Sequence, residues 1–363
     1  MNILGIMSGN SCDGLDCCEV HIDINSAYQL EYKINKFSTL PYSDSEKSFI
    51  HSLRDNEKYK IKESEIELTR IYIKKIKQFS DLKGIDYIAC HGQTVHHVDK
   101  SVSIQLFDYK FFFNYFKIPV VYNFRENDIK NGGNGAPLMP FLDWLLFSDL
   151  YKEVVTLNIG GISNISYIPK NKQKDKVLGF DTGPGMCLVD MACRSLFDAK
   201  YDMDAMYSRK GIVNKNILNQ LLNLNCIKKI PPKSMDITDF KYDVLSELAI
   251  ENSEFNNNDI VRTFVEFSIE SIDYNITKFI KLNKSDFKLI CSGGGIEHPM
   301  IKSGLIERGY KVESISSYGI DSSIKEALLI ATLGACKIIN LNSNMPSVTG
   351  ANKDVVLGEI YSG

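Results

Sequence analysis

The chain has 363 residues and a formal net charge of −3, a length that allows about two domains of roughly 150 residues each. Because the charge is nearly balanced, the sequence lacks the basic field that binds nucleic acids, and we expect no nucleic-acid partner. The first residues lack a secretory signal and no apolar run reaches about 18 residues, so we expect no membrane partner. The nine cysteines are scattered without a CxxC pair, which favours reduced thiols in a cytoplasmic protein.

Apolar runs and helical spacing alternate along the chain. In chain order, the runs that predict strands are residues 2–7, 17–24, 28–37, 87–90, 119–122, 154–158, 165–168, 177–180 and 287–291. The segments that predict helices are residues 43–53, 63–80, 109–116, 138–147, 185–197, 214–225, 242–252, 258–281 and 322–340. Ser322 and Ser323 are cap candidates for the last helix, and the glycine cluster at residues 131–137 is a candidate domain junction. Because the two element types interleave, the class is α/β with mixed sheets.

Four glycine-rich turns each follow a short apolar run. They are residues 7–14, 158–164, 179–185 and 291–295. A backbone without side chains can approach an anion closely and point its N–H groups at it. Four such turns that also carry Asp, Ser, Thr and Asn favour contacts with phosphate and sugar. The chain has neither GxxxxGK[ST] nor a GxGxxG between a strand and a helix, which argues against a P-loop or a Rossmann site.

Asp181 follows the predicted strand at residues 177–180 and precedes a predicted helix. A carboxylate in this place beside a cleft can act as a general base. It can equally be the N-cap of the helix, since Asp is favoured there. The same choice arises for Asp13 and Asp16, which either contact phosphate or metal-bound water or stabilise the first turn.

The segment His91 to His97 follows the strand predicted at residues 87–90 and allows three interpretations. It is a polar loop with surface histidines, a metal site, or a set of hydrogen-bonding ligands for a polar substrate formed by His91, Gln93 and Thr94. The spacing lacks the helical histidine pair and glutamate of a zinc peptidase. We assign no metal ligand. Without a GxSxG elbow, we also prefer a phosphate turn to a nucleophile at Ser8, Ser11 or Cys12.

In this order, the motifs resemble those of the anhydro-N-acetylmuramic acid kinases. The segment from Gly5 to Asp16, GIMSGNSCDGLD, is similar to that family's opening motif G-[IV]-M-S-G-T-S-x-D-G-[IV]-D. Further similar segments lie at residues 91–95, 103–105, 123–128, 132–138, 158–164, 180–185, 231–234, 293–295, 325–327 and 346–351. The resemblance covers essentially the whole chain.

The resemblance implies a two-domain ribonuclease-H-like ATPase fold of the sugar kinase, Hsp70 and actin type, with mixed sheets and a central cleft. Its first domain would span residues 1–128 and 322–363, and its second residues 129–321. The implied activity opens 1,6-anhydro-N-acetylmuramic acid with water and phosphorylates O6 with ATP and Mg²⁺, giving N-acetylmuramic acid 6-phosphate in peptidoglycan recycling. The implied partners are this small-molecule sugar and a second copy in a homodimer.

The resemblance also implies roles for individual residues. Asp181 would deprotonate the attacking water and contact the sugar. The nucleotide contacts would come from Gly9, Asn10, Ser11, Cys12, Asp13, Gly14, Leu15, Asp16, Gly160, Gly161, Gly293, Gly294 and Gly295. The sugar contacts would come from His91, Gln93, Thr94 and Arg125.

This chain departs from the family pattern at a few positions. Asn10 replaces the usual threonine of the first turn and can still donate a hydrogen bond. Met186 and His298 stand where asparagine is usual, and Met235-Asp-Ile follows Ser234 in place of a small residue, glycine and arginine. These departures leave two alternatives open: a kinase or ATPase of the same fold that acts on another sugar, and a sugar-sensing protein without catalysis.

Overall fold

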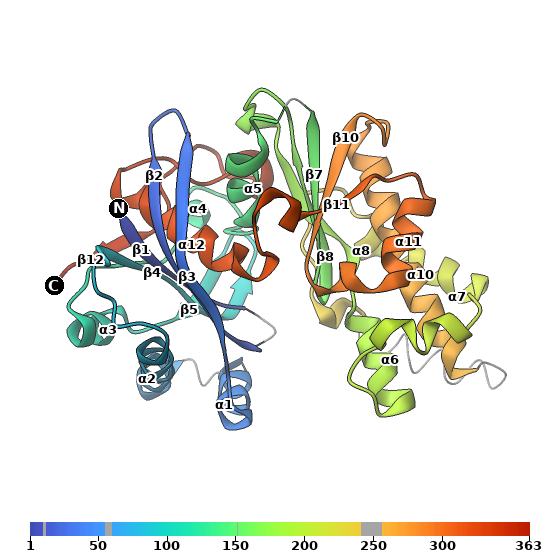
Figure 1. The fold of residues 1–363 in the computed structure, drawn as a ribbon, viewed down its shortest axis with the longest axis horizontal. Helices are drawn as coiled ribbons and strands as arrows, with labels where there is room; N and C mark the ends of the chain where they lie inside the picture. Colours follow the sequence, from blue (N-terminus) through green and yellow to red (C-terminus); the bar gives the residue numbers. More distant parts are fainter. Residues whose placement is uncertain (10–11, 55–59, 151, 241–255) are drawn as a thin grey trace. The chain divides into compact units, whose positions relative to one another are not determined.

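The chain forms two compact units in a computed structural model. The structure describes residues 1–9, 12–54, 60–150, 152–240 and 256–363 (Figure 1). One unit comprises residues 1–146 and 320–363, and the other comprises residues 147–319. The boundaries expected from the sequence lie at residues 128/129 and 321/322.

The first unit is built on a mixed sheet with the strand order β12-β6-β4-β1-β2-β3, and β5 pairs with β4. The strands are β1 (Asn2–Ser8), β2 (Gly14–Ile24), β3 (Leu30–Pro41), β4 (Tyr87–Val98), β5 (Val102–Leu106), β6 (Val120–Tyr122) and β12 (Glu359–Tyr361). Strand β1 is antiparallel to β2 and parallel to β4, and β4 is parallel to β6.

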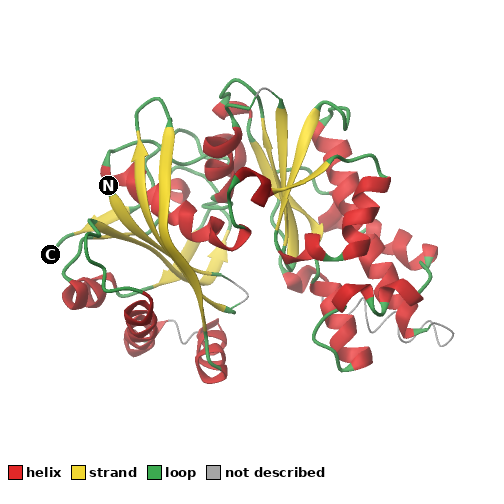
Figure 2. Cartoon of the chain, viewed as in Figure 1, coloured by secondary structure: helices red, strands yellow, loops and turns green. Residues whose placement is uncertain are grey.

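Helices cover both faces of this sheet (Figure 2). They are α1 (Asp44–Arg54), α2 (Lys62–Phe79), α3 (Tyr109–Phe116), α4 (Glu126–Lys130), α5 (Met139–Phe147), α12 (Lys325–Ile338) and α13 (Pro346–Thr349). Apolar residues of α1, α2 and α3 form one core with Leu4 and Ile6 of β1. Side chains alternate between the faces of a strand, so Gly5 faces the other side, where α12 packs against β1, β2 and β4.

The second unit repeats the same topology with five strands in the order β11-β10-β7-β8-β9. The strands are β7 (Glu153–Ile159), β8 (Ile162–Ile168), β9 (Leu178–Pro184), β10 (Phe287–Ser292) and β11 (Val312–Ser314). The three strands β7, β8 and β9 form an antiparallel meander, while β10 is parallel to both β7 and β11. This order of three antiparallel strands followed by two parallel ones is ribonuclease-H-like in both units, and it confirms the predicted class.

The helices of the second unit are α6 (Cys187–Phe197), α7 (Lys215–Leu222), α8 (Asn225–Lys228), α10 (Asn257–Ile280) and α11 (Pro299–Glu307). Long helix α10 packs against β9, and its Phe264, Phe267 and Ile272 lie in one apolar core with Leu157 and Phe180. Every member of this core comes from residues 147–319, so the second unit has a hydrophobic interior of its own. No described helix is long and apolar enough to cross a membrane.

Most predicted elements are confirmed, but four local predictions need comment. The helix predicted at residues 242–252 lies outside the described residues. The glycine turn predicted at residues 179–185 is wrong, because residues 178–184 form strand β9. The polar-loop interpretation of residues 91–97, one of the three left open, is also wrong, because these residues continue strand β4. The cap predicted at Ser322 and Ser323 is wrong as well: a 3-10 turn comes first, and its cap is the Asp321 carboxylate, which accepts from the Ser323 N–H at 2.9 Å.

The glycine cluster at residues 131–137 lies within the first unit and is not a domain junction. The buried carboxylate of Asp128 organises this segment. One oxygen accepts from the Gly135 N–H at 2.8 Å, and the other accepts from Asn344 at 2.9 Å and Thr349 at 2.8 Å. These bonds join the glycine cluster to the segment around α13, which lies far along the chain. The residues around 131 alone therefore could not predict this contact.

Candidate active site

The first glycine turn joins β1 to β2 in the first unit. The Cys12 N–H donates to the Gly9 carbonyl at 3.3 Å, and Cys12 is buried in a left-handed conformation. A Cβ on Gly14 would lie 2.7 Å from the Leu40 carbonyl oxygen, so β3 packs too closely for a larger residue there. Leu15 is buried in the first core. The remaining turn residues expected to bind nucleotide, 10 and 11, lie outside the described residues.

Gln93 holds this turn from the neighbouring strand β4. Its Oε1 accepts from the Ser8 hydroxyl at 2.6 Å, and its Nε2 donates to the Gly9 carbonyl at 3.4 Å. The Ser8 hydroxyl also lies 3.0 Å from the Tyr42 hydroxyl. Gln93 is fully buried, so its amide fixes the backbone at the start of the turn. The neighbouring Thr94 accepts from Gln105 at 3.4 Å.

His91, which is buried, and Arg125, which is half-buried, form a hydrogen-bonded pair in the same unit. The Arg125 Nε donates to the His91 Nε2 at 3.0 Å, and the His91 Nδ1 lies 2.9 Å from the Gly92 carbonyl. Since a carbonyl can only accept, the His91 proton is on Nδ1 and the ring is neutral. Burial, with the Arg125 charge in support, lowers the pKa of His91 to about 3. A second Arg125 nitrogen donates to the Gly135 carbonyl at 2.8 Å.

Three carboxylates stand near the first turn. Asp13 is exposed and 4.0 Å from the Lys47 ammonium. Asp16 accepts from the Thr39 hydroxyl at 2.5 Å, and burial raises the pKa of its carboxyl. Glu326 of α12 has its pKa raised by desolvation and then by the Asp16 charge. Glu326 is not among the site residues predicted from the sequence, since α12 brings it beside Asp16 from more than 300 residues away.

Asp181 lies within strand β9 of the second unit and is half-buried. Its Oδ2 accepts from the Met235 N–H at 2.7 Å, and its own N–H donates to the Lys233 carbonyl at 3.2 Å. The N-cap interpretation is wrong, because the N-cap of α6 is Met186. The carboxylate is instead oriented by the segment at residues 231–235, one of the motifs found in the sequence.

Lys233, whose carbonyl accepts from the Asp181 N–H, is a further residue that was not predicted to belong to the site. Its ammonium is buried and donates to the Ile227 carbonyl at 2.6 Å and the Asn275 amide oxygen at 2.7 Å. Burial lowers the pKa of Lys233 to about 8, while the Asp181 charge opposes this shift. Lys233 is therefore mostly charged at pH 7 and fixes the backbone that orients Asp181.

The other two glycine turns pack closely at the ends of β7 and β10. The N–H groups of residues 185–187 donate to the Gly160 and Gly161 carbonyls at 2.8 to 3.1 Å. These bonds occupy the N–H groups at the start of α6. A Cβ on Gly293 would lie 2.5 Å from the Ile159 carbonyl oxygen, and one on Gly295 would lie 2.3 Å from the Ile159 side chain, whereas Gly294 is open.

A cavity of about 400 Å³ lies between these two turns, within the 300–1,000 Å³ typical of small-molecule sites. Glycines 160, 161, 294 and 295 form part of its wall, and Met186, Asp190 and His298 line it too. Two of the positions at which this chain departs from the family pattern, 186 and 298, therefore face one cavity. The departure at Met235 lies elsewhere, since its N–H binds Asp181.

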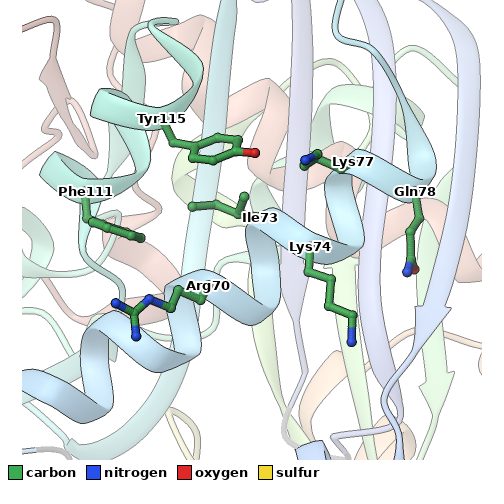
Figure 3. Close-up of a pocket in the computed structure, with 7 residues that line it drawn as sticks. All are labelled: Arg70, Ile73, Lys74, Lys77, Gln78, Phe111 and Tyr115. Carbon is green, nitrogen blue, oxygen red and sulfur yellow. The ribbon is translucent and has the colours of Figure 1, made fainter.

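A larger cavity, of about 520 Å³, lies between α2 and α3 and contains no predicted site residue (Figure 3). Two of its three cations lie over its aromatic rings, Arg70 over Phe111 at 5.8 Å and Lys77 over Tyr115 at 5.7 Å, and the third, Lys74, lies 3.9 Å from the Glu46 carboxylate. Among the residues that the structure describes, no three His, Cys, Asp or Glu side chains are grouped to hold a metal ion.

Comparisons with known proteins agree with the motifs. A family model described as anhydro-N-acetylmuramic acid kinase matches residues 1–363. An anhydro-N-acetylmuramic acid kinase from Clostridioides difficile is 33% identical, covering 99% of this chain and 98% of that protein, and one from Bacillus cereus is 32% identical with 99% of each covered. A solved activator of 2-hydroxyisocaproyl-CoA dehydratase from Clostridium difficile with bound ADPNP has a TM-score of 0.44 and 9% identity, covering 91% of this chain and 93% of that one.

Proposed function

This chain belongs to the anhydro-N-acetylmuramic acid kinase family, and we propose that it opens 1,6-anhydro-N-acetylmuramic acid with water while transferring the γ-phosphoryl group of ATP to O6. Asp181 accepts one proton of the water as the water oxygen bonds to C1. The C1–O6 bond breaks, O6 bonds to the γ-phosphorus, and ADP departs. Asp181 then releases its proton to solvent, and the products are N-acetylmuramic acid 6-phosphate and ADP.

The observation that carries this proposal is the orientation of Asp181. A general base must be held within hydrogen-bonding reach of the proton that it removes. The Met235 N–H at 2.7 Å holds one carboxylate oxygen of a half-buried side chain on a rigid strand. The buried Lys233, anchored by two strong hydrogen bonds, keeps the supporting segment in place.

The first turn supports phosphate binding in the other unit. Gly9 to Asp16 offer a backbone that Gln93 fixes through Ser8 and Gly9. We assign Gln93 a positioning role, since both ends of its amide are engaged in holding the turn. His91 and Arg125, held together at 3.0 Å, and the adjacent Thr94 are the proposed sugar contacts.

The carboxylates near this turn fit Mg²⁺. This ion binds one or two carboxylates together with substrate phosphates. Asp16 and Glu326 would each supply a carboxylate ligand, and desolvation raises the pKa of both carboxyls, which favours a cation beside them. Bound there, Mg²⁺ would neutralise charge on the phosphates during transfer.

The cavity between the glycine turns of the second unit is the proposed site for the nucleoside end of ATP. Gly294 and Gly161 leave room at its wall. Since Met186 and His298 line this cavity, their departure from the family pattern bears on nucleotide binding. We also propose that the protein is a homodimer in the cytoplasm, where ATP is available. Light scattering after size-exclusion chromatography tests the homodimer, which has twice the 41.0 kDa mass of one chain.

The reaction is tested by mass spectrometry of the product formed from the anhydro sugar, ATP and Mg²⁺ in ¹⁸O-labelled water. We expect a 6-phosphate with the label at C1. A product of another sugar, with none from the anhydro sugar, would assign the chain to a different substrate. Nucleotide and sugar binding without any product would assign it to sensing.

The variant Asp181→Asn tests the base. The amide cannot take the proton, and loss of general-base catalysis lowers kcat by about 100- to 10,000-fold. Asp175→Asn, at an exposed acid of the same unit, is the matched control and keeps wild-type turnover. Substantial turnover by folded Asp181→Asn would sink the mechanism.

A further inference from the structure

Four of the six polar side chains that line the 400 Å³ cavity are acidic. Its lining residues include the acids Asp190, Asp202, Asp204 and Glu297, together with His298 and Tyr201, and they include no lysine, arginine, asparagine or glutamine. Such a wall accepts hydrogen bonds and repels anions. If ATP binds as proposed above, the phosphates lie outside this cavity, and the part inside it must donate hydrogen bonds.

The carboxylate of Asp202 already accepts three hydrogen bonds from the protein. Its Oδ1 accepts from the Tyr207 N–H at 2.8 Å, and its Oδ2 accepts from the Ser208 N–H at 3.3 Å and from the His298 Nε2 at 3.1 Å. Burial alone would raise the pKa of Asp202, but these hydrogen bonds outweigh it and lower the pKa. Asp202 is therefore an ionised anchor for His298, and its fully buried carboxylate already accepts three hydrogen bonds.

His298 is held by Asp202 through one of its ring nitrogens. Its Nε2 lies 3.1 Å from the Asp202 carboxylate, so Nδ1 is the ring nitrogen that this contact leaves over. Within the described part of the chain, this nitrogen has no hydrogen-bond partner although the side chain is only 5% exposed. A buried polar atom without a partner is costly, and its residue lines the cavity, so a polar group on a bound molecule would relieve that cost.

Asp190 is the half-buried acid of this wall, whereas Asp204 and Glu297 are exposed to solvent. It lies in the first turn of α6, and among the described residues its carboxylate has no hydrogen-bond partner, only longer-range electrostatic interactions with Arg194, Lys200, Asp202 and His298. The side chain is half-buried and lines the cavity. A half-buried carboxylate of this kind is completed by two hydroxyl groups, since each of its oxygens can accept.

We propose that Asp190 binds the ribose diol of the nucleotide, its carboxylate accepting hydrogen bonds from the 2′ and 3′ hydroxyl groups while the Asp202-anchored His298 closes the same wall. This inference rests on the proposed function for the presence of a nucleotide in the cavity. It assigns the chain's selectivity for ribonucleotides to a residue that neither contacts phosphate nor takes part in the proton transfer.

The test is calorimetric titration of the wild-type protein with ATP and with 2′,3′-dideoxy-ATP, with Mg²⁺ and without sugar. Loss of hydrogen bonds to a charged group predicts that the dideoxy nucleotide binds about 10- to 100-fold more weakly. In Asp190→Asn, ATP binding weakens by a similar factor and the preference for ATP falls to about twofold or less. Asp175→Asn keeps the wild-type preference.

Each result decides the matter. The proposal is overturned if the wild type binds the two nucleotides equally or does not bind ATP. It is also overturned if folded Asp190→Asn retains the full preference for ATP. Circular dichroism checks that the variant folds by comparing its α-helical signal with that of the wild type. A protein that prefers ATP through Asp190 but makes no phosphorylated anhydro sugar would leave this inference standing and overturn the proposed function alone.

Discussion

At the scale of the residue, the ionisation of Asp190 is unusual for an aspartate. Burial raises the pKa of its carboxyl to about 6, Asp202 adds to this shift, and the positive charges of Arg194 and Lys200 and the side chain of His298 oppose it. The carboxyl therefore changes charge just below neutral pH, where an ordinary aspartate is fully ionised.

This pKa predicts a pH dependence of nucleotide affinity. Hydroxyl donors bind the ionised carboxylate, so binding favours loss of the proton and ATP affinity rises with pH up to about 6 and then levels off. Below about 6, the wild type loses affinity relative to Asp190→Asn by roughly tenfold per pH unit at most. Titrations of both proteins between pH 5 and 8 measure the ratio of their Kd values, in which the nucleotide's own ionisation cancels. A ratio independent of pH would contradict the prediction.

At the scale of the element, β1 and α12 pack with almost no space between them at Gly5. A Cβ on Gly5 would lie 2.1 Å from the Ala327 carbonyl oxygen and 2.9 Å from the Ala331 Cβ. Strand β1 leads directly into the first glycine turn, and α12 carries Glu326. This contact therefore sets the separation of two elements that both reach the proposed phosphate site.

The variant Gly5→Ala tests this packing. Overpacking a filled interior destabilises a protein by about 1–3 kcal/mol, and rigid backbone at the contact places the loss at or above the upper end. Urea unfolding followed by fluorescence and circular dichroism measures the change. Gly84→Asn is the control, because Gly84 has open space around it and Asn tolerates its positive φ. If Gly5→Ala changed the free energy of unfolding by less than about 0.5 kcal/mol, α12 would have moved to make room for the added methyl group, which contradicts the prediction.

Element types follow from local patterns, whereas the environment of polar residues depends on distant partners. The apolar runs around Ile88 and Leu289 predict strands correctly, because several consecutive residues are apolar and all of them favour burial. The segment after Cys90 reads as a loop since it is polar, yet it is a buried strand. His91 and Gln93 are stable there because Arg125 and Ser8 satisfy them, and neither partner lies nearby in the sequence.

The same division applies to the candidate site. Asp181 and the glycine turns could be found from motifs, because strand, turn and acid lie together in the chain. Asp190, by contrast, looks like an ordinary polar position of an amphipathic helix. Only the fold places it in a wall with residues near 202 and 298.

At the scale of the whole molecule, the two units differ in how the chain builds them. Residues 147–319 are contiguous and contain a complete apolar core. The first unit needs two separate segments, and the later one supplies α12, which is buried along most of its length. The units should therefore differ in whether an uninterrupted piece of chain can fold.

Expression of two fragments tests this difference. Residues 147–319 should unfold cooperatively with heat, as a contiguous domain with its own core does. Residues 1–146 should not, because one face of the sheet is left without α12 and exposes Ile3 and its apolar neighbours to water. Calorimetry and amide hydrogen exchange distinguish the two. Cooperative unfolding by the fragment 1–146 would contradict the prediction.

The split first unit also sets an order of events on the ribosome. Domains commonly fold in the order in which they emerge. Here the sheet that emerges first must wait until residues 320–363 follow it, a delay of about 10–40 s at about 5–20 residues per second. The contiguous unit completes itself in the meantime. The half that begins the chain is thus the last to become native, and during that interval its uncovered sheet is the part of the nascent chain that a chaperone would protect.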